Sequence, residues 1–403
     1  MTMSALFQTA IVNIGTIITG DLAEPVIAGD TIICRDSSIA IVGTASAADV
    51  EACDVIIDAA GAVACPGLID SHVHITFGDY TPRQKTVGFL ESYTHGGITT
   101  AISASEVHVP GRPGDPAGVK ALAIAARKCF EHFRPGGMRV HAGAVILEPG
   151  LTREDFDELA RNCVRLAKAG FGAFASPYDY APFVRMARES GMITMAHTGG
   201  SSIPGSSGIW ADPVLAMNPD VSFHVNGGPV AMPDADFPRL VNESAIALQI
   251  CTAGNLRTAL LVARLLEEKE ALERLLVATD TPTGSGIMPL GILYTVSHLA
   301  SLGGMAPEIA IAAATGNNAR VYGLNSGIVA RGRDADIILL DACAGGATGD
   351  ALSALRNGDI AAVGAVITDG RPRFVGRSRN TPAPTRSIRV ARTTVMNDFA
   401  AHH

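Results

Sequence analysis

The sequence of 403 residues lacks the usual signs of a disulfide-bonded, membrane-spanning or secreted protein. The seven cysteines are scattered and form no C-x-x-C pair, so we expect no disulfide framework and a reducing compartment. No apolar run approaches the roughly 18 residues that a membrane span needs. The N-terminus lacks a basic segment followed by an apolar one, so we expect no signal peptide and a cytoplasmic protein.

The chain also lacks a long basic run, and its formal net charge of -8 argues against a nucleic-acid surface. What is present is a globular composition, 47% hydrophobic and 17% charged, which suffices for a large core. A single (β/α)₈ barrel takes roughly 250 residues. The length therefore fits one barrel and one smaller domain.

Runs of β-branched and apolar residues, separated by turn residues, occupy both ends of the chain. Thr31–Cys34 is one such run near the N-terminus, and Ala362–Thr368 is another beyond Gly327. We therefore predict a small β-sandwich domain assembled from two distant segments, residues 1–62 and 326–403. The tail of the second segment is rich in Pro, Thr and Arg, and we expect it to form an arm that docks on another subunit.

The intervening residues 63–325 alternate strand-like runs with helical stretches, which is typical of βα units and a parallel sheet. Strands are expected at Thr99–Ser103, Arg139–Leu147, Gly170–Ala175, Ile193–His197, Val221–Val225, Ala245–Ile250 and Leu275–Asp280. Helices are expected at Pro116–Phe130, Arg153–Lys168, Ala181–Ser190 and Leu256–Leu272. The predicted fold class is thus α/β, a distorted (β/α)₈ TIM barrel.

The most specific motif is the string from Pro66 to His74, which reads P-G-L-I-D-S-H-V-H. Alternate residues of a strand point to one face, so His72 and His74 project together at the end of the strand. In a (β/α)₈ barrel the chemistry lies at the strand C-termini, where one metal ion can take both imidazoles. Asp70 is either an acceptor for a ligating imidazole or a buried structural carboxylate.

Three further candidates also end predicted strands: His197, His224 and Asp280. A histidine alone at a strand end is more often structural than functional. Their order after an H-x-H strand, however, places four histidines and one carboxylate at a single barrel mouth. This set of donors suits Zn²⁺, with Fe²⁺ or Mn²⁺ as alternatives.

With these residues the chain resembles the amidohydrolase superfamily, and within it the enamidase branch. The histidine and aspartate pattern is shared across the superfamily, whereas several longer strings are narrower and extend the resemblance nearly from end to end. They are Gly78–Thr86, Pro110–Pro113, Gly143–Glu148, His197–Ser207, Asn226–Pro229, Pro289–Leu293 and Ser378–Pro382.

The resemblance implies a binuclear metal centre that hydrolyses a small cyclic amide. His72 and His74 would hold the more buried ion. His197 and His224 would hold the second ion, and Asp280 would bind the first ion and act as the proton shuttle. The substrate of the enamidase branch is 6-oxo-1,4,5,6-tetrahydronicotinate, a lactam that carries a carboxylate, and its opening ends in ammonia release. Members of the superfamily commonly form dimers or tetramers, so we expect a homo-oligomer.

Lys168 stands where the resemblance implies a glutamate that bridges the two ions. An ammonium group cannot ligate a metal, but other branches of the superfamily use a lysine there that CO₂ has carbamylated. We hypothesise that Lys168 is carbamylated and bridges the ions. The alternative is an ordinary lysine at a helix end, with the bridge lost and a single ion bound.

A substrate carboxylate requires a cation or several hydrogen-bond donors, and the loop after the H-x-H strand offers Arg83 and Tyr80. The alternatives are a surface arginine and a packing tyrosine. Rival functions are another ring opener (of the hydantoinase, dihydroorotase or imidazolonepropionase type) or a mononuclear deaminase. A rival from a different class is a non-catalytic barrel used for assembly.

Overall fold

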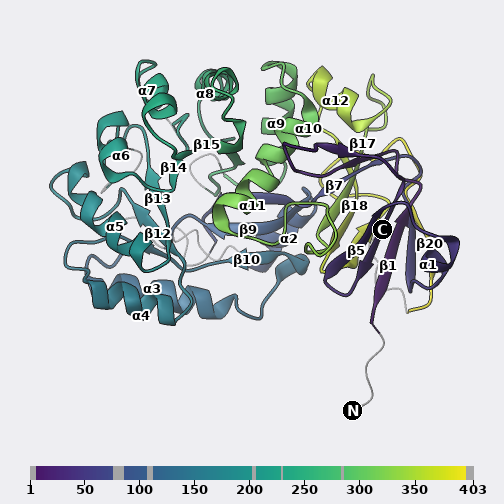
Figure 1. Ribbon diagram of the computed structural model, residues 1–403, viewed down its shortest axis with the longest axis horizontal. Coiled ribbons are helices and arrows are strands. Elements are labelled where there is room, and N and C mark those ends of the chain that lie inside the picture. The colour runs from purple at the N-terminus through teal and green to yellow at the C-terminus, as the bar shows by residue number, and fades with distance from the viewer. Residues whose placement is uncertain are drawn as a thin grey trace, which may run out of the picture.

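The computed structural model describes residues 6–75, 86–106, 112–201, 206–227, 230–282 and 286–395. Within these ranges, two groups of elements lie side by side (Figure 1). One group is a barrel of parallel strands with helices outside it. The other is a pair of smaller sheets, in which purple strands from the start of the chain lie among yellow strands from its end. The α/β fold class predicted from the sequence is confirmed.

The barrel strands follow one another around the barrel in sequence order. They are β8 (Leu68–Val73), β9 (Ile98–Ser103), β10 (Arg139–His141), β11 (Ala144–Ile146), β12 (Leu166–Ala169), β13 (Ile193–His197), β14 (Val221–Phe223), β15 (Ala247–Cys251) and β16 (Leu275–Ala278). Hydrogen bonds divide them into two parallel arcs, β10-β9-β8 and β11 to β16. Because β10 and β11 are two pieces of the single predicted strand Arg139–Leu147, the strands occupy eight positions around the barrel.

Helices cover the outside of the barrel. They are α2 (Thr86–Thr94), α3 (Pro116–Cys129), α4 (Arg153–Arg161), α5 (Ala181–Glu189), α6 (Ala211–Met217), α7 (Asp236–Glu243), α8 (Leu256–Glu268), α9 (Gly291–Ser301), α10 (Pro307–Ala313) and α11 (Gly316–Tyr322). In the part of the chain that the structure describes, no helix combines the length and the apolarity that crossing a membrane would require.

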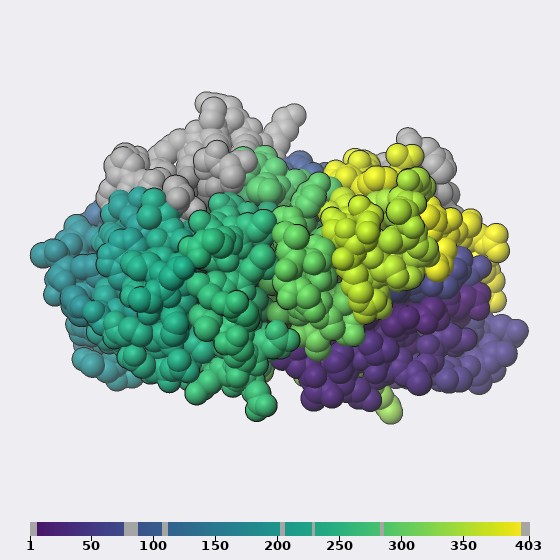
Figure 2. Space-filling model, turned by 90° about the horizontal axis from the view of Figure 1, so that it is seen from above, coloured from purple at the N-terminus to yellow at the C-terminus, as the bar shows by residue number. Residues whose placement is uncertain are grey.

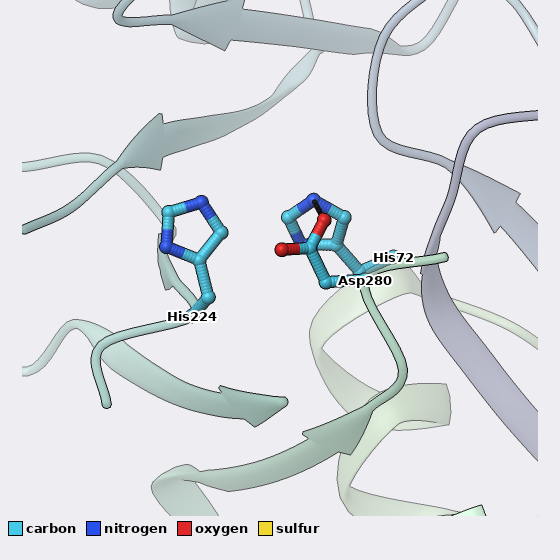
Figure 3. A group of neighbouring side chains, drawn as sticks. All are labelled: His72, His224 and Asp280. Atoms are coloured by element: carbon cyan, nitrogen blue, oxygen red, sulfur yellow. Dashed lines mark ion pairs between the residues drawn. The ribbon is translucent and has the colours of Figure 1, made fainter. Parts of the chain in front are cut away.

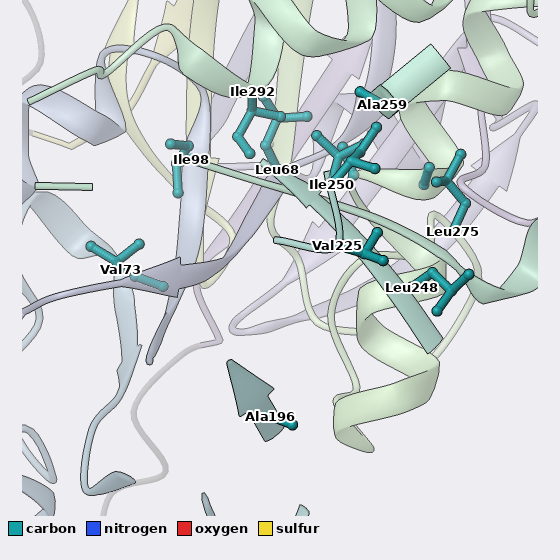
Figure 4. Close-up of a cluster of buried hydrophobic side chains, with 14 of the residues drawn as sticks. Leu68, Val73, Ile98, Ala196, Val225, Leu248, Ile250, Ala259, Leu275 and Ile292 are labelled. Atoms are coloured by element: carbon teal, nitrogen blue, oxygen red, sulfur yellow. The ribbon is translucent and has the colours of Figure 1, made fainter. Parts of the chain in front are cut away.

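The side chains of the barrel strands alternate between an inner and an outer core. In β13, Met195 belongs to the cluster inside the barrel, whereas Ala196 belongs to the cluster that includes helix residues such as Ala259 and Ile292. Figure 4 shows part of this second cluster. The next residue, His197, therefore points inward again, at the C-terminal end of the strand. The same period of two turns Lys168 of β12 and Gln249 of β15 into the barrel. The alternation thus presents buried polar side chains at the barrel mouth.

Two mixed sheets pack face to face beside the barrel. The first has the order β20-β6-β1-β4-β5, and the second has the order β19-β18-β17-β7-β2-β3. Their strands are β1 (Gln8–Val12), β2 (Thr16–Ile18), β3 (Val26–Ile27), β4 (Thr31–Arg35), β5 (Ser38–Gly43), β6 (Val55–Asp58), β7 (Val63–Pro66), β17 (Ile337–Asp341), β18 (Ala362–Thr368), β19 (Arg371–Val375) and β20 (Arg389–Thr393). The two short helices are α1 (Ala47–Glu51) and α12 (Ala351–Asn357). Ile57 and Leu339, one from each sheet, share a buried core.

The division of the chain into residues 1–62 with 326–403 and residues 63–325 stays a prediction. In the structure, β7 lies in the second small sheet, and only Gly67 separates it from barrel strand β8. The tail that was expected to form an arm adds β20 to the chain's own first sheet, antiparallel to β6. All seven cysteines lie within the described residues, and none of them forms a disulfide.

One part of the barrel differs from the expectation. The helix predicted over Arg153–Lys168 ends early as α4, and the strand predicted at Gly170–Ala175 lies earlier, as β12. Cys163, with a φ of 60°, turns the chain out of the helical direction. Parallel pairing with β11 and β13 then imposes a strand on leucine, alanine and lysine, which favour helix in isolation. Lys168 therefore belongs to the barrel wall and not to a helix end.

Gly143 lies where β10 gives way to β11 and adopts a φ of 97°. A Cβ atom there would lie 2.8 Å from the backbone oxygen of Ala123 in α3. We expect Gly143→Ala to lower the free energy of unfolding by more than about 2 kcal/mol, because backbone strain and this close approach add. Urea unfolding would measure the loss. The control is Gly191→Ala, with a φ of 80° in open space, which should cost only about 1–2 kcal/mol. Equal losses would contradict the role of the contact with α3.

Candidate metal centre

The structure brings the five predicted metal ligands together at the C-terminal ends of the barrel strands, and all five are buried. They are His72 within β8, His74 directly after it, His197 at the end of β13, His224 directly after β14 and Asp280 two residues after β16. Figure 3 shows Asp280 against His72, with His224 on the opposite side. Ligating atoms of these three residues lie within 4.8 Å of one another.

The contacts among the five side chains fall into two groups. The Oδ1 atom of Asp280 lies 3.0 Å from Nε2 of His72 and 3.4 Å from Nε2 of His74. Separately, Nδ1 of His197 lies 3.1 Å from Nε2 of His224. The rings of His72 and His224 connect the groups, with centroids 5.3 Å apart.

Two of these residues have unusual backbone conformations. His224 adopts a φ of 32° and Asp280 a φ of 59°, in the left-handed region that non-glycine residues rarely enter. The amide of Asp280 donates to the carbonyl of His72 at 3.0 Å, which helps to hold this conformation. Such strain persists where the surrounding structure enforces it, and it is concentrated at functional sites.

The electrostatics of the site leave the imidazoles of His72, His197 and His224 neutral and the carboxyl group of Asp280 charged. Burial lowers the pKa of His72 and His197 to about 4, and it holds the pKa of His224 well below its usual value. Burial alone would raise the pKa of Asp280, but its interactions with His72 and His74 outweigh burial and hold this pKa well below the usual range. Neutral imidazole and ionised carboxylate are the forms that ligate metals.

The donor geometry fits a divalent ion. The Nε2 atom of His197 lies 3.0 Å from the carbonyl of Gly200, so in neutral His197 this nitrogen carries the proton and Nδ1 has the lone pair. That lone pair faces Nε2 of His224, whose Nδ1 is buried without a hydrogen-bond partner among the described residues. Ligand nitrogens of one tetrahedral ion lie about 3.3 Å apart, close to the separation found here.

Lys168 lies in the same buried region, inside the barrel on β12. Its Nζ atom lies 4.0 Å from the centroid of the Phe223 ring, one residue before His224. Burial lowers the pKa of the lysine to about 7. A substantial fraction of Lys168 is therefore a neutral amine near neutral pH.

Gln249 completes the surroundings of His72, and the sequence analysis missed it. Its Oε1 atom lies 2.8 Å from Nδ1 of His72, and its Nε2 atom donates to the Ser71 hydroxyl at 2.8 Å. The bond fixes the proton of His72 on Nδ1 and leaves the lone pair on Nε2, which faces Asp280. The sequence offered one sign of this role, because Gln249 is the only amide side chain in the otherwise apolar strand β15.

Asp70 accepts from the backbone of His72 and not from its imidazole. Its carboxylate accepts from the amide of His72 at 3.2 Å, from the amide of Thr279 at 3.0 Å and from the Thr279 hydroxyl at 2.5 Å. Of the two readings of Asp70, the structure thus favours the buried structural carboxylate. The two predicted substrate contacts, Tyr80 and Arg83, lie outside the described residues.

Comparison with known proteins identifies the family to which the chain belongs. Residues 229–377 match the model of the amidohydrolase family. The chain is 45% identical to enamidase from Eubacterium barkeri over 384 residues, which cover 95% of this chain and 99% of that protein. It also matches the crystal structure of enamidase with a TM-score of 0.90, at 45% identity, over 95% of this chain and 100% of that one. The chain therefore belongs to the amidohydrolase family and is a hydrolase of C–N bonds.

A second likeness is much shorter. The chain is 38% identical to imidazolonepropionase from Paenarthrobacter aurescens, but only over 99 residues, or 24% of each protein. The likeness to enamidase, in contrast, covers 95% of this chain. The rival interpretation of a non-catalytic assembly barrel is not supported.

Gln249→Leu tests how His72 is oriented. The change removes the acceptor for Nδ1 of His72, so we expect retention of divalent metal to weaken roughly 10–100-fold in dialysis against a chelator, followed by metal analysis. Gln249→Glu keeps an acceptor and should retain more metal than Gln249→Leu. Unchanged metal retention in Gln249→Leu, in protein whose thermal melting shows an intact fold, would refute this role.

Proposed function

We propose that the protein is an enamidase-like hydrolase that opens a small cyclic amide carrying a carboxylate and releases ammonia. The observation that carries this proposal is the likeness to enamidase along 95% of the chain. The buried set of four histidines and one aspartate supports it. The reaction of imidazolonepropionases is less favoured, because that likeness covers about a quarter of the chain.

Two divalent metal ions are the proposed cofactors, with Zn²⁺ first and Fe²⁺ or Mn²⁺ as alternatives. The grouping of contacts supports two positions, since Asp280 lies against His72 and His74 while His197 lies against His224. Imidazole nitrogen and carboxylate oxygen suit all three metals. When bound, such ions lower the pKa of water and stabilise negative charge on a carbonyl oxygen.

Asp280 is the proposed proton carrier. Its carboxylate is anionic and lies at the barrel mouth among the imidazoles. It takes a proton from the attacking water and gives it to the lactam nitrogen as the C–N bond breaks. The enamine released by ring opening tautomerises to an imine, and a second water converts the imine to an aldehyde and ammonia. The proposed contacts for the substrate carboxylate are Arg83 and Tyr80.

Lys168 is the proposed bridge between the ions, as a carbamate. Its pKa of about 7, lowered by burial, provides the neutral amine that attacks the carbon of CO₂ and then loses one proton. The product has a carboxylate where a lysine has only an ammonium group. If Lys168 does not bridge, we expect a single ion per chain.

The proposal also includes a cytoplasmic location and a homo-oligomer, either a dimer or a tetramer. The seven free cysteines agree with a reducing compartment.

The first experiment uses protein loaded with Zn²⁺, Fe²⁺ or Mn²⁺ and 6-oxo-1,4,5,6-tetrahydronicotinate, with ultraviolet absorbance and ammonia as readouts. We expect loss of absorbance with ammonia release that a chelator abolishes. Asp280→Asn should lower kcat at least about 100-fold, because no group then takes the proton. Absence of lactam turnover by metal-loaded protein, with turnover of an imidazolone instead, would overturn the proposed substrate and leave the family assignment intact.

A series at Lys168 tests the bridge. Wild-type protein should bind one ion per chain in CO₂-depleted buffer and two when bicarbonate is present. Lys168→Glu supplies a carboxylate directly and should bind two ions in either buffer, whereas Lys168→Met should bind one in both. Metal analysis of each protein, with native mass spectrometry to detect one added CO₂, measures this. Two ions in Lys168→Met, or in wild-type protein without added CO₂, would refute the carbamate.

A further inference from the structure

A cavity of about 360 Å³, apart from the metal centre, opens at the N-terminal ends of two barrel strands. It is lined by Arg165, directly before β12, by Leu166 and Ile193 at the starts of β12 and β13, and by residues of α3 and β10. His197 lies four residues farther along β13, which is about 13 Å at the rise of a strand. The cavity is therefore separate from the metal centre.

The lining of this cavity is strongly cationic. Arg127, Arg134, Arg139 and Arg165 contribute four guanidinium groups, and Glu131 is the only carboxylate among the lining residues. Glu131 itself pairs with a neighbouring lysine of the chain at 3.7 Å. A concentration of positive charge within one cavity, with so little negative charge in its lining, favours an anionic ligand.

Two of the four arginines are already neutralised at the edge of the small sheets. Arg134 pairs with Asp369, and Arg139 pairs with Asp334 and, at 3.0 Å, with Asp369. These ion pairs use carboxylates that do not line the cavity. They fix the two guanidinium groups in place beside it.

The other two arginines have no such partner. Arg127 donates to the backbone oxygen of Cys163 at 3.2 Å. Within the described ranges, no carboxylate lies within ion-pair distance of Arg127 or Arg165. Two guanidinium charges thus remain to be balanced, which matches a ligand with two negative charges.

His141 adds an unsatisfied polar atom to the same cavity. Its Nε2 atom is buried without a hydrogen-bond partner among the described residues, and so is Nε of Arg139. Burial and the four neighbouring guanidinium groups lower the pKa of His141 to about 4, so its ring is neutral. Buried polar atoms are nearly always paired, so two such atoms beside one cavity indicate an acceptor that belongs there.

The size and the walls of the cavity indicate an organic ligand. A volume of about 360 Å³ lies in the range of small-molecule sites, roughly 300–1,000 Å³, and exceeds what an inorganic anion fills. The lining also has apolar side chains, those of Ile102, Phe130, Val140 and Leu166. An anion with a hydrocarbon body would cover these side chains.

We propose that this cavity is a binding site for a small organic dianion, a dicarboxylate with a short methylene chain. Arg127 and Arg165 each take one carboxylate, His141 donates to one of them, and the methylene chain lies on the apolar wall. The proposal does not depend on the reaction at the metal centre. It assigns a second ligand site to the N-terminal side of the barrel, which the catalytic proposal does not use.

Glutarate and inorganic phosphate are the probes, measured by calorimetry on the full-length protein at one ionic strength. We expect saturable binding of glutarate, tighter than that of phosphate because only glutarate covers the apolar wall. Arg165→Gln should weaken glutarate binding at least about fivefold, since an exposed guanidinium loses one charge-assisted interaction. The matched control is Arg264→Gln on the exposed surface of α8, which should leave binding unchanged.

His72→Ala separates the two sites. It removes a ligand of the proposed metal centre, so glutarate binding that persists in this variant belongs to the arginine-lined cavity. Loss of binding in His72→Ala with retention in Arg165→Gln would place the dicarboxylate at the metal centre and overturn the proposal. Phosphate binding as tight as glutarate would overturn the organic ligand, and absence of binding by both probes would overturn the site.

Discussion

A buried carboxylate, together with backbone hydrogen bonds, ties the first strand of the barrel to its last. In the described residues, β8 and β16 belong to different sheets. Asp70 joins them by accepting from Thr279 through both its amide and its hydroxyl, and from the amide of His72. Burial raises the pKa of Asp70 to about 7, and the three donors oppose this rise because they stabilise the ionised form. Since His72 and Asp280 adjoin the bonded atoms, closing the barrel also sets these two side chains 3.0 Å apart.

The five candidate ligands could be predicted because each one lies at or near the end of a strand whose pattern is local. The strand Ile193–His197, for example, has the same bounds in the prediction and in the structure. The apolar residues before its histidine indicate a strand without any information on the neighbouring strands. The same holds for the H-x-H string, in which His72 and His74 alternate with Val73 at the end of a strand. Local alternation together with a parallel fold places such residues at one mouth of the barrel. The small sheets could also be predicted, because their strands are rich in β-branched residues between clear turns.

Lys168 and Gln249 show where that reasoning ends. The strand around Lys168 consists of residues that favour a helix, and only the ladders to β11 and β13 make it a strand. Gln249 acquires its role from His72, which lies 177 residues away in the chain. The local pattern of apolar and polar residues predicts neither the strand at Lys168 nor the contact of Gln249. Both depend on which strands become neighbours when the barrel closes. Distances between atoms, and hence the neutral state of the buried imidazoles, follow only from that closure.

The topology of the small sheets also determines when their strands can pair during translation. β7, at residues 63–66, is hydrogen-bonded on one side to β2 and on the other to β17, which starts at residue 337. At the ribosome's rate of roughly 5–20 residues per second, about 15–60 seconds separate the emergence of these two partners. During that interval the edge of β7 that will receive β17 has no strand beside it, and exposed edges of this kind recruit strands from other chains. The nascent protein therefore completes its sheet only after all of the barrel strands have been translated, and until then that open edge is a target for chaperones and for aggregation.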